Sequence, residues 1–505
     1  PWPSLALAAM LVAAAACGDG LGAGATCSNH SQCASQYQCL GQICVPRCDD
    51  HRDCGDGYQC GDSGTCNIVD SSVGDACASE WECGLGQSCV LDATDFDNDK
   101  RIASSCQEQA IGGNVSSECK LDSDCQNSLC SMGRCSQLCA TDSDCPIGTN
   151  CALIPRLLAE DTGLFQGCLQ NTGVLEHKIL MTEAAARLPI IVPSTAHSFA
   201  LVSQVDDDIH RIGAIKVVSP TGELLFGGDS SLEQLLANPI RYIRRQGIST
   251  LLIPNSDVLE LQTGIYQVDM EATAPAPPFG PGTAIPEVSV FYKMDQGKTL
   301  DLHFYFLNLN EHPCGDNFGA RDLLGKNVLN ATTARSSIFF QDDYLPEIQS
   351  ILGAAEIETG LISYTDIDRA DLDGIVDGDL YDLFRLAENE SGIAIFFVRS
   401  LWPDGVQASI GGIPGPPRSP GTSASGIAIS ADTLCYRSWT DVARATAHSL
   451  ASQMGLWNNR DLEGSPDPIV DTTGTTDNLM FFGEFGGKDL TPGQASVLSR
   501  YPGLQ

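Results

Sequence analysis

The strongest constraint on the fold is a set of twenty cysteines between residues 27 and 168, which divide into five groups of four. Each group has the spacing C-x5-C-x4/5-C, and its last gap holds four, five or sixteen residues. Segments this short bury too little apolar surface to fold unaided, so such modules are held by disulfide bonds. We predict five tandem disulfide modules over residues 27–168. Four cysteines allow three pairings, and the spacing does not choose among them.

Short sequences before the second cysteine of each module also repeat, as in His-Arg-Asp-Cys54, Glu-Trp-Glu-Cys83 and Asp-Ser-Asp-Cys125. They resemble the Asp-x-Asp-Cys modules that bacterial surface proteins carry in tandem. Zinc binding is the alternative interpretation of such spacing. We favour disulfide bonds because the array has no C-x-x-C pair and because an exported chain is oxidised.

The start of the chain predicts export. Residues 4–16 form an apolar run that is long enough for a signal peptide and too short to span a bilayer. Because the chain starts at Pro1 without a basic region, we predict a truncated signal peptide over residues 1–16. The run ends in Ala-Ala-Ala-Cys17-Gly, which resembles the bacterial lipobox and implies lipidation of Cys17 and a linker over 17–26. Simple secretion is the alternative.

The net charge of −36, from 64 acidic and 28 basic residues, excludes nucleic acid as a partner because a phosphate backbone would be repelled. No further stretch is apolar enough to cross a membrane, so a lipid anchor would be the sole membrane attachment. We expect an extracytoplasmic protein, either a lipoprotein of the bacterial cell envelope or a secreted one. The expected partner is an extracellular protein or peptide of unknown identity.

Residues 176–297 contain short alternating apolar runs separated by turn sequences such as Ser219-Pro-Thr-Gly222. This period is typical of half-buried strands. The predicted strands cover 198–205, 212–218, 249–253, 265–270 and 288–292. We predict an all-β sandwich of the jelly-roll type.

Residues 298–505 predict one α/β domain. Strands are expected at 300–306, 392–398 and 426–430, and a helix is expected at 336–352 despite Pro346. A second helix should run from about Asp441 to Met454. A last helix should follow Thr491-Pro-Gly-Gln494, a capping box with proline at the first helical position. The predicted fold class is multidomain: disulfide-rich tandem repeats, then an all-β sandwich, then an α/β domain.

The second of these helices leads into a recognisable motif, His448-Ser449-Leu-Ala-Ser452-Gln-Met-Gly455-Leu-Trp-Asn458, and Asp-Asn-Leu-Met480 follows it. Their frame resembles the metzincin zinc site, H-E-x-x-H-x-x-G-x-x-H, and its later Met-turn. The turn and the Thr-Pro-Gly-Gln helix are most similar to the pappalysin-like branch. The resemblance covers about 200 residues and implies a metzincin-like fold for residues 298–505.

Most of the chemistry that the resemblance implies is missing. Ser449 stands where the family has its catalytic Glu, and Ser452 and Asn458 stand at two of the three ligand positions. A neutral hydroxyl is a poor zinc ligand, and a serine cannot act as a carboxylate base. We predict no catalytic residue, and His448 is the one remaining candidate metal ligand. Without the resemblance, His448 and Met480 are simply core residues.

The densest carboxylate run covers residues 366–379. Its candidate calcium ligands are Asp366, Asp368, Asp371, Asp373 and Asp377. Oxygen ligands suit Ca²⁺, but the spacing departs from D-x-[DN]-x-[DN]-G-x5-E and leads into an amphipathic helix. A charged turn with carboxylates at a helix N-terminus is the favoured interpretation. We expect no cofactor, with zinc and calcium as the alternatives.

The favoured hypothesis is a lipid-anchored or secreted surface protein in which a catalytically inactive metzincin-like domain acts as a binding or scaffold module. The alternative is a zinc metalloendopeptidase with non-standard ligands. A third hypothesis is a structural envelope protein that packs against its neighbours.

Cys314 and Cys435 are the two cysteines beyond residue 168, and they form an even pair in an oxidised domain. We predict a disulfide bond between them, which would tie the loop after the strand at 300–306 to the start of the motif helix. A non-reducing peptide map should show the two peptides linked, and reduction should separate them. Recovery of both residues as free thiols would contradict the prediction.

Overall fold

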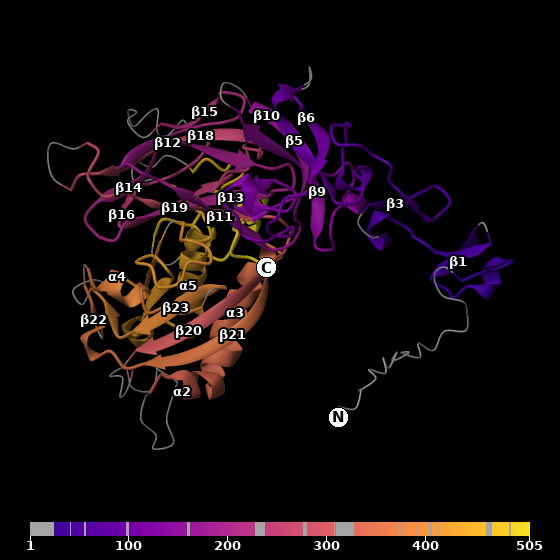
Figure 1. The fold of residues 1–505 in the computed structure, drawn as a ribbon. Helices are drawn as coiled ribbons and strands as arrows, with labels where there is room; N and C mark the ends of the chain where they lie inside the picture. The colour runs from indigo at the N-terminus through magenta and orange to yellow at the C-terminus, as the bar shows by residue number, and fades with distance from the viewer. Residues whose placement is uncertain are drawn as a thin grey trace, which may run out of the picture.

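The computed structural model describes residues 25–505 except 41, 55–56, 97–99, 159–161, 228–237, 276–279, 308, 310–327, 373, 377, 390, 403–406, 413, 461–466 and 484–485. The predicted signal peptide and Cys17 lie outside these residues. Figure 1 shows disulfide modules leading into a β-sandwich, which lies against an α/β domain. The predicted multidomain fold class is confirmed. Within the described part of the chain, no helix has the length and apolar character needed to cross a membrane.

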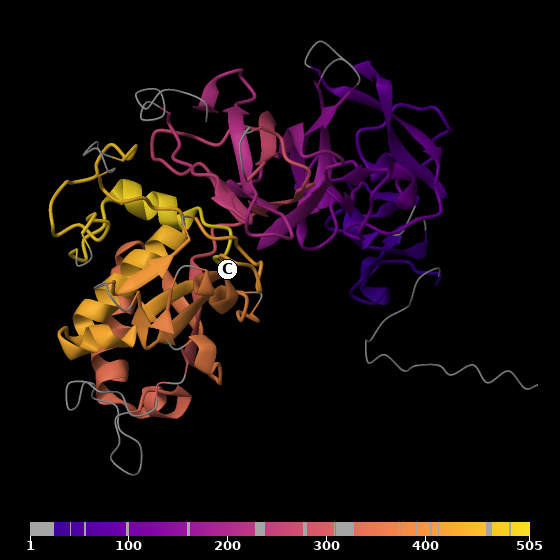
Figure 2. The ribbon, with the colours of Figure 1, turned by 90° about the vertical axis from the view of Figure 1, so that its left-hand side faces the viewer.

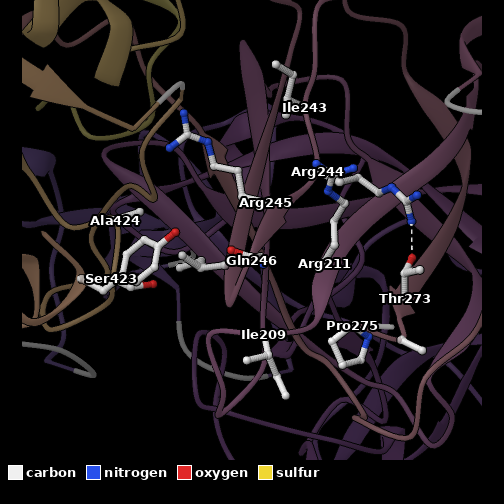
Figure 3. Close-up of a pocket in the computed structure, with 13 residues that line it drawn as sticks. Ile209, Arg211, Ile243, Arg244, Arg245, Gln246, Thr273, Pro275, Ser423 and Ala424 are labelled. Carbon is white, nitrogen blue, oxygen red and sulfur yellow. Dashed lines mark hydrogen bonds between the residues drawn. The ribbon is translucent and has the colours of Figure 1, made fainter. Parts of the chain in front are cut away.

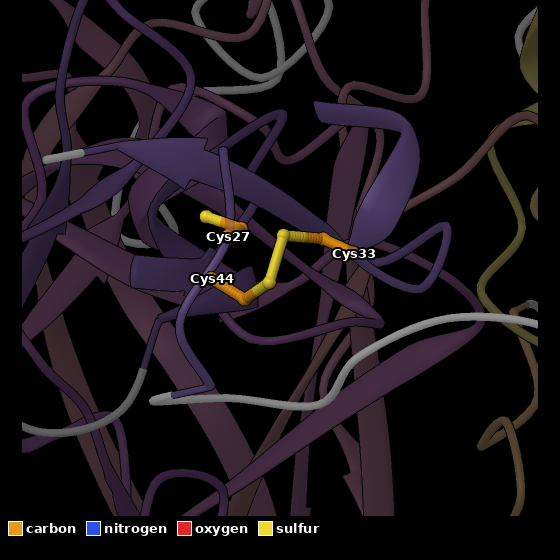
Figure 4. A group of neighbouring side chains, drawn as sticks. All are labelled: Cys27, Cys33 and Cys44. Atoms are coloured by element: carbon orange, nitrogen blue, oxygen red, sulfur yellow. A yellow bond between two sulfur atoms is a disulfide. The ribbon is translucent and has the colours of Figure 1, made fainter. Parts of the chain in front are cut away.

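All five modules have the same disulfide pairing, first cysteine to third and second to fourth. Figure 4 shows one of these bonds, Cys33–Cys44, beside Cys27. The ten bonds are Cys27–Cys39, Cys33–Cys44, Cys48–Cys60, Cys54–Cys66, Cys77–Cys89, Cys83–Cys106, Cys119–Cys130, Cys125–Cys135, Cys139–Cys151 and Cys145–Cys168. Of the three pairings that the spacing allows, one is therefore used throughout.

Each module consists of one turn of 3-10 helix followed by a β-hairpin. The elements are η1 (His30–Gln32), β1 (Tyr37–Leu40) and β2 (Ile43–Pro46); η2 (His51–Asp53), β3 (Tyr58–Cys60) and β4 (Cys66–Ile68); η3 (Glu80–Glu82), β5 (Gln87–Phe96) and β6 (Ile102–Glu108); η4 (Asp122–Asp124), β7 (Cys130–Ser131) and β8 (Arg134–Cys135); η5 (Asp142–Asp144), β9 (Thr149–Leu157) and β10 (Thr162–Gln170). The third and fourth cysteines face each other across every hairpin. Their bonds to the first two cysteines therefore fasten both strands to the preceding turn.

The repeated residues before the second cysteine are hydrogen-bond acceptors for the backbone of their own module. The side chain three positions before that cysteine accepts from the N–H of the third cysteine, at 2.8 to 3.1 Å in all five modules. The side chain directly before it accepts from the residue after the first cysteine, at 2.6 to 2.8 Å. At Asp124 these backbone bonds lower the pKa of the carboxyl. The repeated side chains thus provide hydrogen-bond acceptors for backbone N–H groups in a module that is too small to have a core.

The second, third and fifth modules meet at Asp144, which is 3% exposed. The indole N–H of Trp81 donates to the Asp144 carbonyl at 2.9 Å, and the His51 ring stacks on Trp81 with ring centroids 6.2 Å apart. The Gln137 amide donates to the same carbonyl at 2.7 Å. The later modules therefore form a cluster, while the module containing β1 lies farthest from the sandwich (Figure 1).

The sandwich consists of two antiparallel sheets, with strand orders β11-β19-β13-β17 and β12-β18-β14-β15; β16 pairs with β14 beside the second sheet. The strands are β11 (Val174–Leu180), β12 (Ala185–Val192), β13 (Ser198–Gln204), β14 (Arg211–Val218), β15 (Leu224–Gly227), β16 (Arg245–Gln246), β17 (Ile248–Ile253), β18 (Gly264–Thr273) and β19 (Glu287–Lys293). Pro189 lies in the edge strand β12, where a missing N–H is tolerated. Ile154 and Phe165 of the fifth module are buried in the same core, so the sandwich and the module array are continuous.

The α/β domain is built on a five-stranded sheet of order β21-β20-β23-β26-β25, parallel except for the antiparallel edge strand β25. Its elements are β20 (Thr299–Leu307), α2 (Ala331–Ser336), η7 (Phe339–Tyr344), α3 (Leu345–Ala354), β21 (Glu358–Ile367), η8 (Ala370–Leu372), β22 (Gly374–Ile375), α4 (Asp379–Phe384), β23 (Ile393–Val398), β24 (Ser400–Leu401), β25 (Ser409–Gly411), β26 (Ile427–Ser430), η9 (Ala431–Cys435), α5 (Trp439–Gln453) and α6 (Pro492–Ser499). Helices α3 and α5 pack on one face of the sheet, and α4 packs on the other.

The helix predicted over 336–352 is present from residue 338 to Ala354, with a π-helical segment in its first part. The segment α2 ends before Ser337, which is extended, and a π-helical segment then leads into α3. Pro346 is the second residue of α3 and directly follows the π-helical segment, so it has no N–H to donate to the preceding turn. Strand β25, at Ser409–Gly411, was not among the predicted strands.

Replacing Asp144 by Ala should destabilise the module cluster by about 1–3 kcal/mol, because two backbone N–H groups lose a buried acceptor. Calorimetric unfolding of the oxidised protein should show the change. Ser143→Ala, one residue away on the same turn, should change the free energy of unfolding by less than about 0.5 kcal/mol. Equal effects of the two substitutions would show that the carboxylate has no special role.

Candidate functional site

Helix α5 carries the motif, and its sequence explains its position. Ser438 accepts from the Asp441 N–H at 3.1 Å, and the Asp441 carboxylate accepts from the Ser438 N–H at 3.2 Å, which closes a capping box. Small buried residues such as Ala443 and Ala447 let the helix pack closely on the sheet. The helix ends before Gly455, whose φ of +110° favours glycine.

His448 is half-buried on α5 and faces the Met-turn. Its Nδ1 lies 2.8 Å from the Leu479 carbonyl, and the Asn458 side chain hydrogen-bonds the same imidazole. A carbonyl can only accept, so Nδ1 carries the hydrogen. Met480 is fully buried beside this contact, and the Asn459 N–H donates to its carbonyl at 2.6 Å. The fold therefore brings together three parts of the motif that are separated in sequence.

Both serines of the motif are buried, and the Ser449 side chain helps to attach α5 to the sheet. The Ser449 hydroxyl donates to Ser409 Oγ at 2.8 Å, and the Ser409 hydroxyl donates to the Ala445 carbonyl at 2.9 Å. This chain of bonds attaches α5 to the antiparallel edge strand β25. Ser452 is 5% exposed.

The donor set around His448 does not fit zinc. At the motif positions it contains one imidazole, that of His448, together with hydroxyls and an amide. Zinc in proteins is held by thiolates, imidazoles and carboxylates. In the part of the chain that the structure describes, the groups of three or more His, Cys, Asp or Glu with adjacent ligand atoms consist of disulfide cysteines. The contact that the structure shows for the His448 imidazole is the hydrogen bond to the Leu479 carbonyl.

Gln453, a residue that sequence reasoning missed, holds a loop against the last turn of α5. The Gln453 side chain donates through Nε2 to the Ala424 carbonyl at 3.1 Å. The backbone carbonyl of Gln453 accepts from the Gly415 N–H at 2.9 Å. A Cβ at Gly415 would lie 1.6 Å from Gln453 Nε2, so the close approach requires glycine. The available signal was a polar side chain on the apolar face of the predicted helix.

The sandwich covers the end of the motif helix. A Cβ at Gly455 would lie 2.5 Å from Cδ2 of Leu252 in β17, and Ala424 is buried in a cluster with Leu252 and Phe291. Figure 2 shows α6, in yellow, between the sandwich and the rest of the α/β domain. Arg500, directly after α6, donates through Nη1 to the Ser256 carbonyl at 2.6 Å.

The candidate calcium ligands are dispersed where the structure describes them. Asp366 accepts from the Ala331 N–H at 2.7 Å, at the N-terminus of α2. Asp371 pairs with Arg369 at 2.7 Å, and Asp368 is exposed. Asp373 and Asp377 lie outside the described residues, so neither the favoured charged turn nor the calcium alternative is tested.

The predicted link between Cys314 and Cys435 also remains a prediction. Cys435 is disulfide-bonded, and Cys314 lies outside the described residues.

The solved structures that match this chain include two distant likenesses. The crystal structure of archaemetzincin (amzA) from Methanopyrus kandleri aligns with 41% of this chain and 90% of its own, at 11% identity and a TM-score of 0.21. An acetyl xylan esterase (Est2A) from the rumen bacterium Butyrivibrio proteoclasticus aligns with 39% of this chain and 49% of its own, at 10% identity and a TM-score of 0.13. No family model and no curated protein matches. Likenesses at this level leave the function of the chain open.

Burial lowers the pKa of His448, although the bonds to Leu479 and Asn458 oppose the shift. The unfolded chain takes up this proton near the ordinary value of 6.5, so stability that is present above 6.5 is lost as the pH falls towards the folded-state pKa. We expect urea unfolding of the wild type to show a loss of stability from pH 7.5 to 5.5, and His448→Asn to lose less. An identical pH dependence for the two proteins would contradict this.

Proposed function

We propose that this chain is an exported surface protein whose α/β domain is a catalytically inactive, metzincin-like scaffold or binding module. The observation that carries the proposal is the environment of His448. The one imidazole of the motif is held by the Leu479 carbonyl and the Asn458 side chain, with no second imidazole or carboxylate at the motif positions.

The absence of a general base supports inactivity. Ser449 occupies the motif position of the Glu that would activate water, and its hydroxyl is committed to Ser409. A hydroxyl of ordinary pKa takes up no proton at neutral pH, so the residue cannot replace a carboxylate. A working peptidase would need substitutes for the base and two ligands at once.

The contacts around the helix favour a scaffold over a substrate cleft. Leu252 lies against Gly455 where α5 ends, and Gln453 holds the glycine-rich loop on the last turn. The sandwich is thereby fixed to the α/β domain by packing at the motif itself. A ligand approaching this end of α5 would have to displace buried apolar contacts.

Cell-envelope attachment through a lipid on Cys17 is part of the proposal. It is supported by the lipobox-like Ala-Ala-Ala-Cys17-Gly sequence. The ten disulfide bonds of the modules indicate an extracellular, oxidising environment.

Zinc analysis tests the proposal. After dialysis against zinc and then buffer, the wild type should retain substoichiometric metal by elemental analysis. Ser449→Glu/Ser452→His/Asn458→His restores the motif and should gain about one zinc per chain, since three imidazoles form a zinc site. Ser496→His/Ser499→His on α6 controls for histidines added elsewhere.

Two outcomes of the zinc analysis would contradict the proposal. Stoichiometric zinc in the wild type that is lost in His448→Ala, together with chelator-sensitive cleavage of casein, would establish the peptidase alternative. A triple variant that folds and yet gains no zinc would contradict the metzincin-like arrangement of the backbone.

A further inference from the structure

A cavity of about 640 Å³ lies at the junction of the sandwich and the α/β domain (Figure 3). One wall comes from β14, β16 and the end of β18. The other comes from Tyr381 of α4 and from Ser423 and Ala424 of the loop held by Gln453. The cavity is distinct from the His448 site, and nothing in the motif accounts for it.

The lining of this cavity has the opposite charge to the chain as a whole. Arg211, Arg244 and Arg245 line it, and no Asp or Glu is among the described residues that do. The complete chain has 64 acidic residues and 28 basic ones. The described lining of the cavity is therefore positively charged, whereas the chain as a whole is strongly negative.

Two of the three arginines lack a counter-ion among the residues that the structure describes. Arg244 donates to Thr273 Oγ1 at 2.8 Å and lies 4.0 Å from Glu271. Arg211 and Arg245 form no ion pair with any residue that the structure describes. Arg245 is half-buried, and burial lowers its pKa, yet a guanidinium stays charged at any physiological pH. The Arg245 guanidinium has thus lost part of its hydration, and no carboxylate of the described chain pairs with it in exchange.

We propose that this cavity is a binding site for a small anion that carries two or more carboxylate, sulfate or phosphate groups. In Figure 3, Arg245 lies on the side of Ala424, whereas Arg211 and Arg244 lie on the side of Thr273 and Pro275. One acidic group of the ligand would meet each side. Guanidinium groups bind such oxyanions through paired N–H donors.

Apolar residues at the cavity define the rest of the ligand. Ile209 and Ile243 are 55% and 51% exposed, and both line the cavity with Pro275. Exposed branched side chains beside arginines suit a ligand that has an apolar body between its acidic groups.

The size of the ligand follows from the charge of the protein. At physiological salt the Debye length is about 8 Å, so carboxylates farther away than this are largely screened, whereas guanidinium groups in contact with the ligand are screened much less. A long polyanion would also have to lie across the acidic surface and would be repelled. A small anion that fits within the cavity avoids this cost.

Isothermal titration calorimetry of the full chain in 0.15 M NaCl tests the site, with citrate, inorganic pyrophosphate and sulfate as probes and sorbitol as the uncharged control. We expect one-site binding of citrate or pyrophosphate and none of sorbitol. Preference for citrate would assign carboxylates, and preference for pyrophosphate would assign phosphates.

Arg211→Gln and Arg245→Gln should each weaken binding about tenfold, the effect of losing one charge-assisted hydrogen-bonding partner. Arg187→Gln removes the same charge from an exposed ion pair with Asp269 on the same sandwich and should leave binding unchanged. Arg245→Lys, which retains the charge, should weaken binding less than the Gln variant and serves if the latter misfolds. Failure of every probe to bind at about 1 mM, or equal binding by all variants, would overturn the proposal.

Discussion

The architecture depends on the disulfide cross-bracing of the modules. The third and fourth cysteines face each other across each hairpin and bond back to the first and second, so each hairpin is fastened to its preceding turn. Because segments of this size cannot bury a core, the bonds take its place. In the fifth module this bracing fixes the long hairpin β9–β10, which then contributes Ile154 and Phe165 to the sandwich core. The fifth module therefore forms part of the hydrophobic core of the sandwich.

The sandwich in turn determines what is accessible at the motif helix. Leu252 lies where α5 ends at Gly455, and Gln453 attaches the loop that carries Ala424. At this junction the buried polar groups are used for attachment. The Ser449 hydroxyl joins α5 to β25, and the His448 imidazole joins α5 to the Met-turn. These hydrogen bonds thus hold the parts of the motif, namely α5, β25 and the Met-turn, against one another.

Local patterns predicted the individual elements well. The strands expected at 300–306, 392–398 and 426–430 are present as β20, β23 and β26, and the final helix begins at the predicted capping box. These elements carry their own signals, such as a continuous apolar run or a cap. Strand β25 has three residues in a glycine-rich stretch, and its place depends on pairing with β26. The helix predicted over 336–352 is present from residue 338 onward, but no local signal marked the extended conformation of Ser337 or the π-helical segment that follows it.

The sequence by itself determined the five modules, the disulfide chemistry, the class of each domain and the residue types at the motif positions 449, 452 and 458, because each depends on residue identity and near-neighbour spacing. Tertiary structure alone decided which cysteines pair, which carbonyl receives His448, and that Arg211, Arg244 and Arg245 share a cavity with Tyr381. The physical reason is that these contacts join segments whose separation in the chain carries no information about their distance in space. Their geometry is set by the packing of whole sheets and helices against one another.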